Sequence, residues 1–431
     1  MKFSLSKKNF NLVKIVILLF IVLFAPPIIP YININIPLSF ISILIIYTKY
    51  KQTAKKLICN KYVNNFIKYY CIFVLFLIPY ILFRELFNNI GLNPLLLTIY
   101  RFFLLCPVYL INLLLIFCIA KTNTISSKKL IQMALYAFVI QSILSIICLL
   151  IPDVRNYFVS LMIRNESNDI LFTGWQLERR FYGFSNNLLD TFGLGVGIAA
   201  TIPFYLEKKV TIGSAILSFT ILISTILNSR TGILIYIIGL GFYILYNLLS
   251  SKNILRTIKK YLEIIILAFI IIFILRIVLL QISAKTLIWI EEGFSGLFSV
   301  FSGDSANAAD SMGRLFDSES WILPNNIIDL LFGRGHVIYS GIGGIAKSDV
   351  GYVNDIWLVG ILGLPFFYLP FFYLYKSLYK QNSLILKFLS IFFLTSFLVF
   401  NVKGMVIAYN TGIAIQLYII FSILLFDFHE I

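Results

Sequence analysis

The chain has 431 residues, of which 60% are hydrophobic and 41 are phenylalanine, and its mean hydropathy is +0.93. This composition excludes a soluble globular domain. The formal net charge of +16 does not indicate a nucleic-acid-binding protein, because the lysines cluster in short loops between apolar segments, as they do in membrane proteins.

Apolar segments of membrane-spanning length follow one another along the whole chain. A helix needs about 20 apolar residues to cross the hydrocarbon. We therefore predict an all-α integral membrane protein, a single polytopic domain over residues 1–431 with about twelve transmembrane helices. No small-residue cleavage site follows the first segment, so we expect a retained helix rather than a signal peptide. The predicted spans are 13–29, 32–47, 66–83, 95–120, 130–151, 185–206, 211–227, 231–249, 261–283, 351–375, 384–401 and 404–426.

The distribution of charge sets the predicted topology. With twelve spans both termini lie on one side of the membrane, and most of the 35 lysines and arginines fall on that side, including the group from Lys49 to Lys68. The positive-inside rule makes this side cytoplasmic. Most of the 19 acidic residues fall on the other side, so charged loops in general do not produce the asymmetry.

Two loops on the side opposite the termini are long, 152–184 and 284–350. Long loops are uncommon unless they carry a function. Within the second loop, the stretch 312–332 (MGRLFDSESWILPNNIIDLLF) mixes apolar and charged residues at roughly helical spacing. We expect short helices there, either in the headgroup interface or packed on the spans.

Apart from charges near the cytoplasmic ends of spans, such as Lys14 and Glu263, five charged residues stand out inside or at the ends of predicted spans: Arg101, Asp190, Arg230, Arg276 and Asp355. Charge in hydrocarbon costs a few kcal/mol or more and is usually kept for function. On the predicted topology all five lie toward the face opposite the termini. This placement indicates a protein that acts on an ionic substrate at one membrane surface.

The motif search excludes several classes of protein. There is no GxxxxGK[ST] sequence, so a nucleotide-driven pump is not expected. The two histidines belong to no Cys/His cluster, and we expect no metal and no cofactor. The five cysteines lie in spans or in a predicted inner loop, which does not suit a disulfide framework. The GLGVG run at Gly193–Gly197 lies inside a span, so close helix packing is a better interpretation than a dinucleotide site.

Three arginines stand out in the predicted outer loops. Arg180 lies in ERRFYGFSNN, Arg230 in the NSRTG turn and Arg314 in SMGRLF. Arginine is permanently charged and binds phosphate oxygens in a bidentate fork, so three that converge at headgroup level would suit a lipid diphosphate. The alternative is that each arginine anchors a helix end or pairs with a lipid phosphate.

These segments resemble the family of O-antigen polymerases and O-antigen ligases, multispanning bacterial glycosyltransferases. The resemblance covers roughly residues 178–365. It rests on the order of four patterns: the R-x-Y-G-F-S-N-N run from Arg180, the S-R-T-G turn at Ser229–Gly232, Arg314 before a W-x-L-P segment and FGRG, and SDVGYVNDIWLVGILG at Ser348–Gly363.

The resemblance implies a glycosyltransferase of the bacterial inner membrane, with both termini cytoplasmic and the active face periplasmic. Such a polymerase transfers a growing glycan from undecaprenyl diphosphate to a sugar hydroxyl of the next lipid-linked repeat unit. Its partners would be lipid-linked oligosaccharides, membrane lipids, and a chain-length regulator and flippase of the same pathway. By matching position, Arg180, Arg230 and Arg314 would bind the diphosphates.

The resemblance also leaves two candidates for the base. The ligases typically have a His-Asn pair where this chain has Ser348-Asp349, which favours polymerase over ligase and makes Asp349 a candidate for binding or deprotonating the acceptor. His336, in GRGHVIY, is the second candidate, because an imidazole suits proton transfer near neutral pH. The possible supporting residues are Glu178, Asp190, Arg276 and Asp355.

Two alternative functions remain open. One is an O-antigen ligase, which transfers the glycan to lipid A core. The other is a flippase for the lipid-linked oligosaccharide, which would also have about twelve spans. A flippase would need substrate and ion sites near the middle of the membrane, whereas the charges here lie toward one face.

The predicted topology can be tested by cysteine labelling. In a cysteine-free background, single cysteines at Ser167 and Ser305 should react with a membrane-impermeant thiol reagent in intact spheroplasts, because both positions lie in the predicted periplasmic loops. A cysteine at Thr53 should remain unlabelled, and its labelling would overturn the topology.

Overall fold

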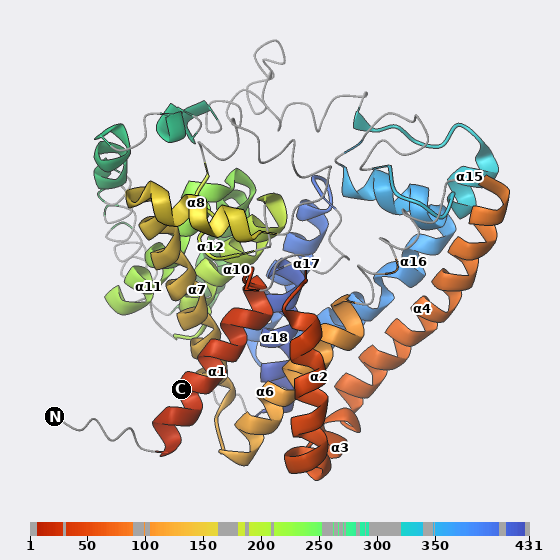
Figure 1. Cartoon of the computed structure of the whole chain (residues 1–431), viewed down its shortest axis with the longest axis horizontal. Coiled ribbons are helices and arrows are strands. Elements are labelled where there is room, and N and C mark those ends of the chain that lie inside the picture. Colours follow the sequence, from red (N-terminus) through yellow and green to blue (C-terminus); the bar gives the residue numbers. More distant parts are fainter. Residues whose placement is uncertain are drawn as a thin grey trace.

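The computed structural model describes residues 7–28, 32–88, 99, 104–162, 180–185, 189–207, 211–251, 262, 266, 270, 273–281, 285–288, 290–292, 320–338, 348, 350–404 and 411–426. In this part of the chain every regular element is a helix (Figure 1), as the composition predicts.

The helices are named here in chain order. The first half of the chain forms α1 (Lys7–Phe24), α2 (Asn35–Ile45), the π-helix η1 (Ile46–Tyr50), α3 (Lys51–Ile58), α4 (Lys61–Asn88), the π-helix η2 (Leu104–Tyr109), α6 (Leu110–Thr122), α7 (Ser127–Leu150) and α8 (Pro152–Leu161). The second half forms α10 (Leu189–Tyr205), α11 (Ile212–Asn228), α12 (Arg230–Ser250), α15 (Ile327–Phe332), α16 (Gly351–Tyr379), α17 (Leu384–Phe400) and α18 (Thr411–Leu425).

Several of these helices are long and apolar enough to cross a membrane, which suggests a multi-pass membrane protein. Among the described residues there are four such helices, and they overlap the predicted spans 66–83, 130–151, 231–249 and 351–375: Lys61–Arg84, Ser127–Leu150, Thr231–Ser250 and Gly351–Tyr379. Shorter apolar helices accompany them, among them Phe192–Tyr205, Leu384–Phe400 and Thr411–Leu425. The total of twelve spans stays a prediction.

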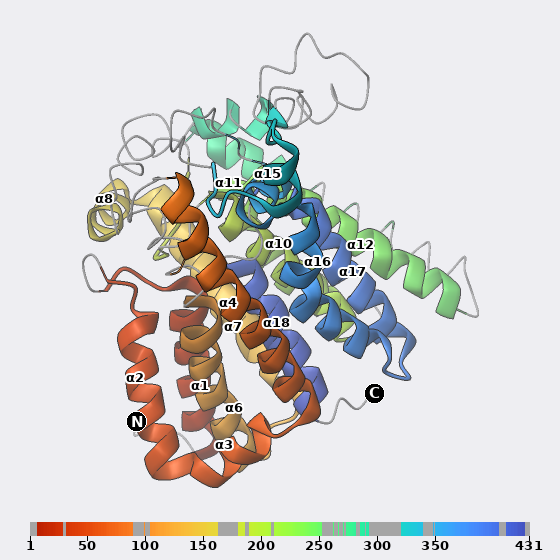
Figure 2. The ribbon, with the colours of Figure 1, turned by 90° about the vertical axis from the view of Figure 1, so that its right-hand side faces the viewer.

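The two ends of the helical bundle carry different segments. Figures 1 and 2 both place α8 and α15 at one end and α3 at the other. Helix α8 belongs to the predicted loop 152–184, α15 to the predicted loop 284–350, and α3 to the lysine-rich group Lys49–Lys68. The predicted topology requires this arrangement. The end with α8 and α15 is called the outer end below.

Glycines bring α10 and α12 into close contact. A Cβ atom on Gly197 would lie 2.3 Å from the carbonyl oxygen of Gly232, and one on Gly193 would lie 2.0 Å from Ser229 Oγ. Neither distance is possible, so only glycine allows the two backbones to approach this closely. The packing interpretation of the GLGVG run agrees with the structure.

The expectation of helical periodicity over 312–332 is wrong for part of the described chain. Residues 321–324 are not helical, and the helix α15 begins only at Ile327. Proline disfavours helical geometry at the residue before it, so Pro324 prevents a helix through Leu323. Asn326 then caps α15, because its Oδ1 accepts a hydrogen bond of 3.0 Å from the N–H of Ile328. Residues 312–319 lie outside the described residues.

The close contact between α10 and α12 predicts a difference between two glycine substitutions. Gly197→Ala should lower the melting temperature of the detergent-purified protein by several degrees, because its methyl group has no space. Gly241→Ala, in α12, should leave the melting temperature unchanged or slightly higher, since nothing lies within 4 Å of its Cβ position and alanine favours helix by about 1 kcal/mol. Equal melting temperatures for the two variants would contradict this account.

Candidate functional site

The segment 180–185 is non-helical chain held against α7 and the outer end of α11. Asn228, the last residue of α11, fixes Phe181 through two hydrogen bonds: its Oδ1 accepts from Phe181 N–H (2.7 Å), and its Nδ2 donates to Phe181 O (2.8 Å). Gln141 of α7 donates from Nε2 to Tyr182 O. Asn228 is fully buried, so its amide supplies partners that hydrocarbon cannot. We call Asn228 and the segment 180–185 the Asn228 cluster.

The Asn228 cluster brings two of the predicted diphosphate arginines to one place. Arg180 directly precedes Phe181, and Arg230 opens α12 two residues after Asn228. The Arg180 guanidinium donates from Nη1 to Tyr182 Oη (3.0 Å). A third arginine lies here as well, because the guanidinium carbon of Arg155 in α8 stacks 5.6 Å from the centre of the Phe181 ring. The side chain of Arg230 lies outside the described residues.

At the start of α16, a second buried amide joins several chain segments. Asn354 is fully buried, and its Oδ1 accepts from Ile338 N–H (3.0 Å) while its Nδ2 donates to Ser348 O and Val350 O (both 2.9 Å). Ser348 Oγ in turn donates to Ser320 O (2.6 Å). A single amide therefore ties the loop that follows α15 to the start of α16, and we call this group the Asn354 cluster.

The Asn354 cluster holds the loop that contains His336 against Ser348 and Val350, the two neighbours of Asp349 in the sequence. His336 precedes Ile338 by two residues, and Asp349 lies between Ser348 and Val350, although Asp349 itself is outside the described residues. His336 is 5% exposed, and its ring centre lies 5.8 Å from that of Trp357. Its burial against an indole makes it less accessible than a free loop histidine.

Two arginines that sequence reasoning missed lie beside His336. Asp329 of α15 forms an ion pair with Arg84 of α4 through Oδ1 and another with Arg334 through Oδ2 (2.8 Å). The guanidinium carbon of Arg334 also stacks 5.1 Å from the Trp357 ring centre. The FGRG motif that contains Arg334 was the only sequence signal, because nothing in the sequence relates Arg84 to Asp329.

The loop with Arg334 docks into a break in α16. Gly360 interrupts this helix with φ 68° and ψ 172°. Carbonyls before a break lack their intrahelical donors, and here Arg334 N–H donates to Trp357 O (2.6 Å) and Gly335 N–H donates to Leu358 O (3.2 Å). Broken helices are tolerated at membrane depth only where protein groups satisfy them in this way.

Asp355 is the buried acid of α16. It is 0% exposed, and its Oδ2 accepts from Tyr368 Oη (2.5 Å) and from Asn401 Nδ2 (2.8 Å). Its Oδ1 has no hydrogen-bond partner among the described residues. These contacts join α16 to the end of α17, so Asp355 has a clear packing role and one unused acceptor.

The remaining predicted residues lie apart from these clusters or outside the described chain. Arg276 forms an ion pair of 3.0 Å with Glu291, and both side chains are half-exposed or more. Asp190 lies in the first turn of α10, but its side chain is not among the described ones. Arg314 and Glu178 lie outside the described residues. Within the described part of the chain, no group of three His, Cys, Asp or Glu residues suits a metal ion.

The Asn228 cluster and the Asn354 cluster lie at the same end of the molecule but on different helices. Figure 1 shows α8 and α15 at opposite sides of the outer end, with α17 between them. Arg180 and the start of α12 therefore belong to one side, and His336 with Arg84 and Arg334 to the other. Comparison with models of known protein families, with curated proteins and with solved structures finds no match for this chain.

The Asn228 hydrogen bonds predict how the segment 180–185 responds to substitution. Asn228→Ala should raise the amide hydrogen exchange of this segment about tenfold or more, because it removes two hydrogen bonds worth about 0.5–1.5 kcal/mol each. Asn247→Ala is the matched control, since among the described residues Asn247 bonds to Tyr243 of its own helix. Mass spectrometry of the exchanged peptides measures the exchange rate of this segment in both variants. An unchanged rate in Asn228→Ala would show that contacts other than the Asn228 hydrogen bonds hold the segment.

Proposed function

We propose that this chain is a multi-pass membrane glycosyltransferase that polymerises oligosaccharides linked to a lipid diphosphate at its outer end. The donor glycan would leave its lipid diphosphate as a sugar hydroxyl of the next lipid-linked unit attacks the anomeric carbon. The resemblance of the segments around Arg180, Arg230 and Ser348–Gly363 to O-antigen polymerases suggests the reaction.

The observation that carries the proposal is the convergence of Arg180 and Arg230 on Asn228. These arginines are 50 positions apart in the chain, yet the two hydrogen bonds between Asn228 and Phe181 bring their backbones together at a helix end. Two arginines carried by backbone that is held in this way would suit the oxygens of a diphosphate. Arg155 over the Phe181 ring adds a third positive charge nearby.

Charge neutralisation is the chemistry that such a site supplies. A diphosphate is a good leaving group once its developing charge is stabilised, so the arginines would replace the general acid that glycosidases need. The proton of the attacking hydroxyl needs an acceptor, for which Asp349 and His336 are the candidates. The Asn354 cluster supports their cooperation, because it holds the loop of His336 against the residues that flank Asp349.

A flippase is the second candidate function, and α16 is the observation that favours it. In secondary transporters, broken helices and buried acids mark the sites of substrates and coupling ions. Helix α16 has both, with the break at Gly360 and the fully buried Asp355. Asp355 nevertheless lies within the first turns of α16 rather than at its centre, which favours chemistry at one face.

Reconstitution separates the two functions. Purified protein given only lipid-linked repeat units in detergent should make polymer and release undecaprenyl diphosphate, without nucleotide or ion gradient. Arg180→Ala and Arg230→Ala should each lower the yield about 100-fold, as the loss of a preorganised charge-stabilising donor does elsewhere. Lysine should restore little, because it lacks the planar fork.

The control for these variants is Lys128→Ala, which removes a cation paired with Glu207 away from both clusters and should leave the yield unchanged. In the same assay, Asp349→Asn should lose most turnover and His336→Gln little. The reverse pattern would assign the proton acceptor to His336. If no polymer forms in detergent while vesicles translocate the lipid-linked unit along an ion gradient, the polymerase proposal is wrong and the flippase is right.

A further inference from the structure

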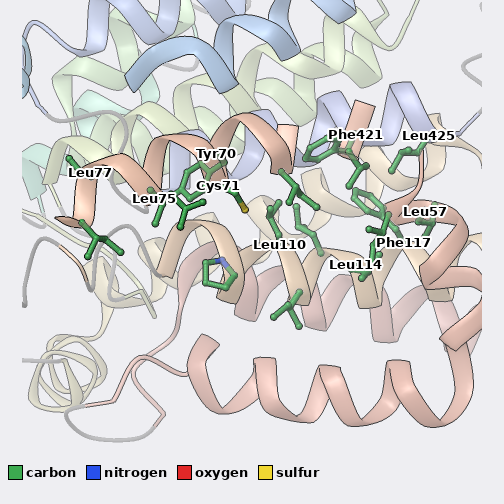
Figure 3. Close-up of a pocket in the computed structure, with 18 of the residues that line it drawn as sticks. Leu57, Tyr70, Cys71, Leu75, Leu77, Leu110, Leu114, Phe117, Phe421 and Leu425 are labelled. Atoms are coloured by element: carbon green, nitrogen blue, oxygen red, sulfur yellow. The ribbon is translucent and has the colours of Figure 1, made fainter. Parts of the chain in front are cut away.

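An apolar groove of about 530 Å³ runs along α4 (Figure 3). Side chains of α4, α6 and α18 form its walls, and Leu57 and Ile58 of α3 close its inner end. The volume lies within the usual range of ligand sites. Leu75, which lines the groove, is 71% exposed, so the groove opens sideways toward the surrounding hydrocarbon.

The groove is about as long as the hydrocarbon core of a bilayer is thick. On α4 its lining extends from Val63 to Ile81, which is about 27 Å along a helix axis and close to the roughly 30 Å of the hydrocarbon core. The lining residues of α4 recur every three or four positions and so form one stripe of the helix. Arg84 follows Ile81 by three residues and continues this stripe at the outer end.

The positively charged loop that precedes His336 packs on α4 just beyond the outer end of the groove. A Cβ atom on Gly335 would lie 3.0 Å from Arg84 Cβ and 3.5 Å from Ile81 Cα, so the FGRG loop packs directly on the last turn of the stripe. Two guanidinium groups, those of Arg84 and Arg334, share the single carboxylate of Asp329 there. The buried Nε of Arg84 has no hydrogen-bond partner among the described residues.

An apolar groove with two arginines just beyond its outer end is complementary to a lipid with a phosphate headgroup. Bulk hydrocarbon would suit the apolar walls but would leave the buried Nε of Arg84, which has no hydrogen-bond partner among the described residues, without an acceptor. The Asn228 cluster, on the other side of the outer end, does not contribute to this groove.

We propose that the groove is a second lipid site, in which a polyprenyl chain lies along α4 and its phosphate binds Arg84 and Arg334. The choice of a polyprenyl chain rests on the proposed function, because a polymerase joins two lipid-linked substrates and needs a place for each. The lipid diphosphate at the Asn228 cluster would then be the donor, and the lipid in the groove would carry the acceptor.

Photocrosslinking of the wild-type protein tests the proposal without sugar transfer. The protein is placed in phosphatidylcholine nanodiscs with a trace of diazirine-bearing undecaprenyl phosphate, and crosslinked residues are identified by mass spectrometry. Crosslinks should concentrate on groove residues such as Cys71, Val74 and Leu114, and be rare on Ile72, which is an exposed residue of the same helix outside the groove. Unlabelled undecaprenyl phosphate should compete better than undecaprenol or phosphatidic acid.

Paired variants locate the chain and the phosphate. Ile78→Trp fills the groove and should lower groove crosslinking about tenfold, whereas Ile72→Trp on the outward face should not. Arg84→Gln should lower it about tenfold, as expected for a lost charge-assisted contact, whereas Arg276→Gln, which breaks a different ion pair, should not.

Crosslinks spread evenly around α4, or equal competition by phosphatidic acid, would overturn the polyprenyl phosphate site. So would unchanged crosslinking in Ile78→Trp and Arg84→Gln. Because no glycan is made in this experiment, its failure leaves the polymerase proposal to be judged by the reconstitution assay. Polymer formation with evenly spread crosslinks would refute the groove alone.

Discussion

Hydrocarbon offers no hydrogen-bond partner, and this constraint decides how the outer end of the bundle is built. Helices satisfy their own backbone, but the segment 180–185 and the loops beside α16 are not helical and must be satisfied by the protein. Buried side-chain amides do this at two places, through Asn228 and Asn354. Without these amides the non-helical segments could not stay buried against the helices, and the charged residues in them would no longer be held in place.

The two amides also explain where the positive charge lies. Asn228 holds the chain that begins with Arg180 against the turn that leads into Arg230, and Asn354 holds the loop that contains Arg334 and His336 against α16. Rigid attachment matters for binding phosphate, because preorganised donors lose little entropy when the ligand arrives. Arginines therefore lie at two places on one end of an apolar bundle, as the proposed binding of two anionic lipids requires.

Local patterns predict much of this structure. Apolar length predicts the long helices, and the spacing of Gly193 and Gly197 predicts close helix packing, for which the structure supplies α12 as the partner. The ion pair between Arg84 and Asp329 could not be predicted, because the two residues are 245 positions apart. In the sequence, Arg84 looks like an ordinary polar residue at the end of a span. The irregular chain at 321–324 was not predicted, because the helical spacing of the apolar residues there suggested a helix although Pro324 prevents one. The roles of Asn228 and Asn354 were missed because a buried amide has no charge and no motif.

The location of bound diphosphate tests the central claim most directly. A cryo-electron microscopy map of the protein with undecaprenyl diphosphate would show where the two phosphates lie. The account predicts density for them at the outer end, in contact with the guanidinium groups of Arg180 and Arg230 beside the Phe181–Asn228 hydrogen bonds. Diphosphate density at the end of the bundle that carries α3, or at a site without an arginine contact, would contradict it.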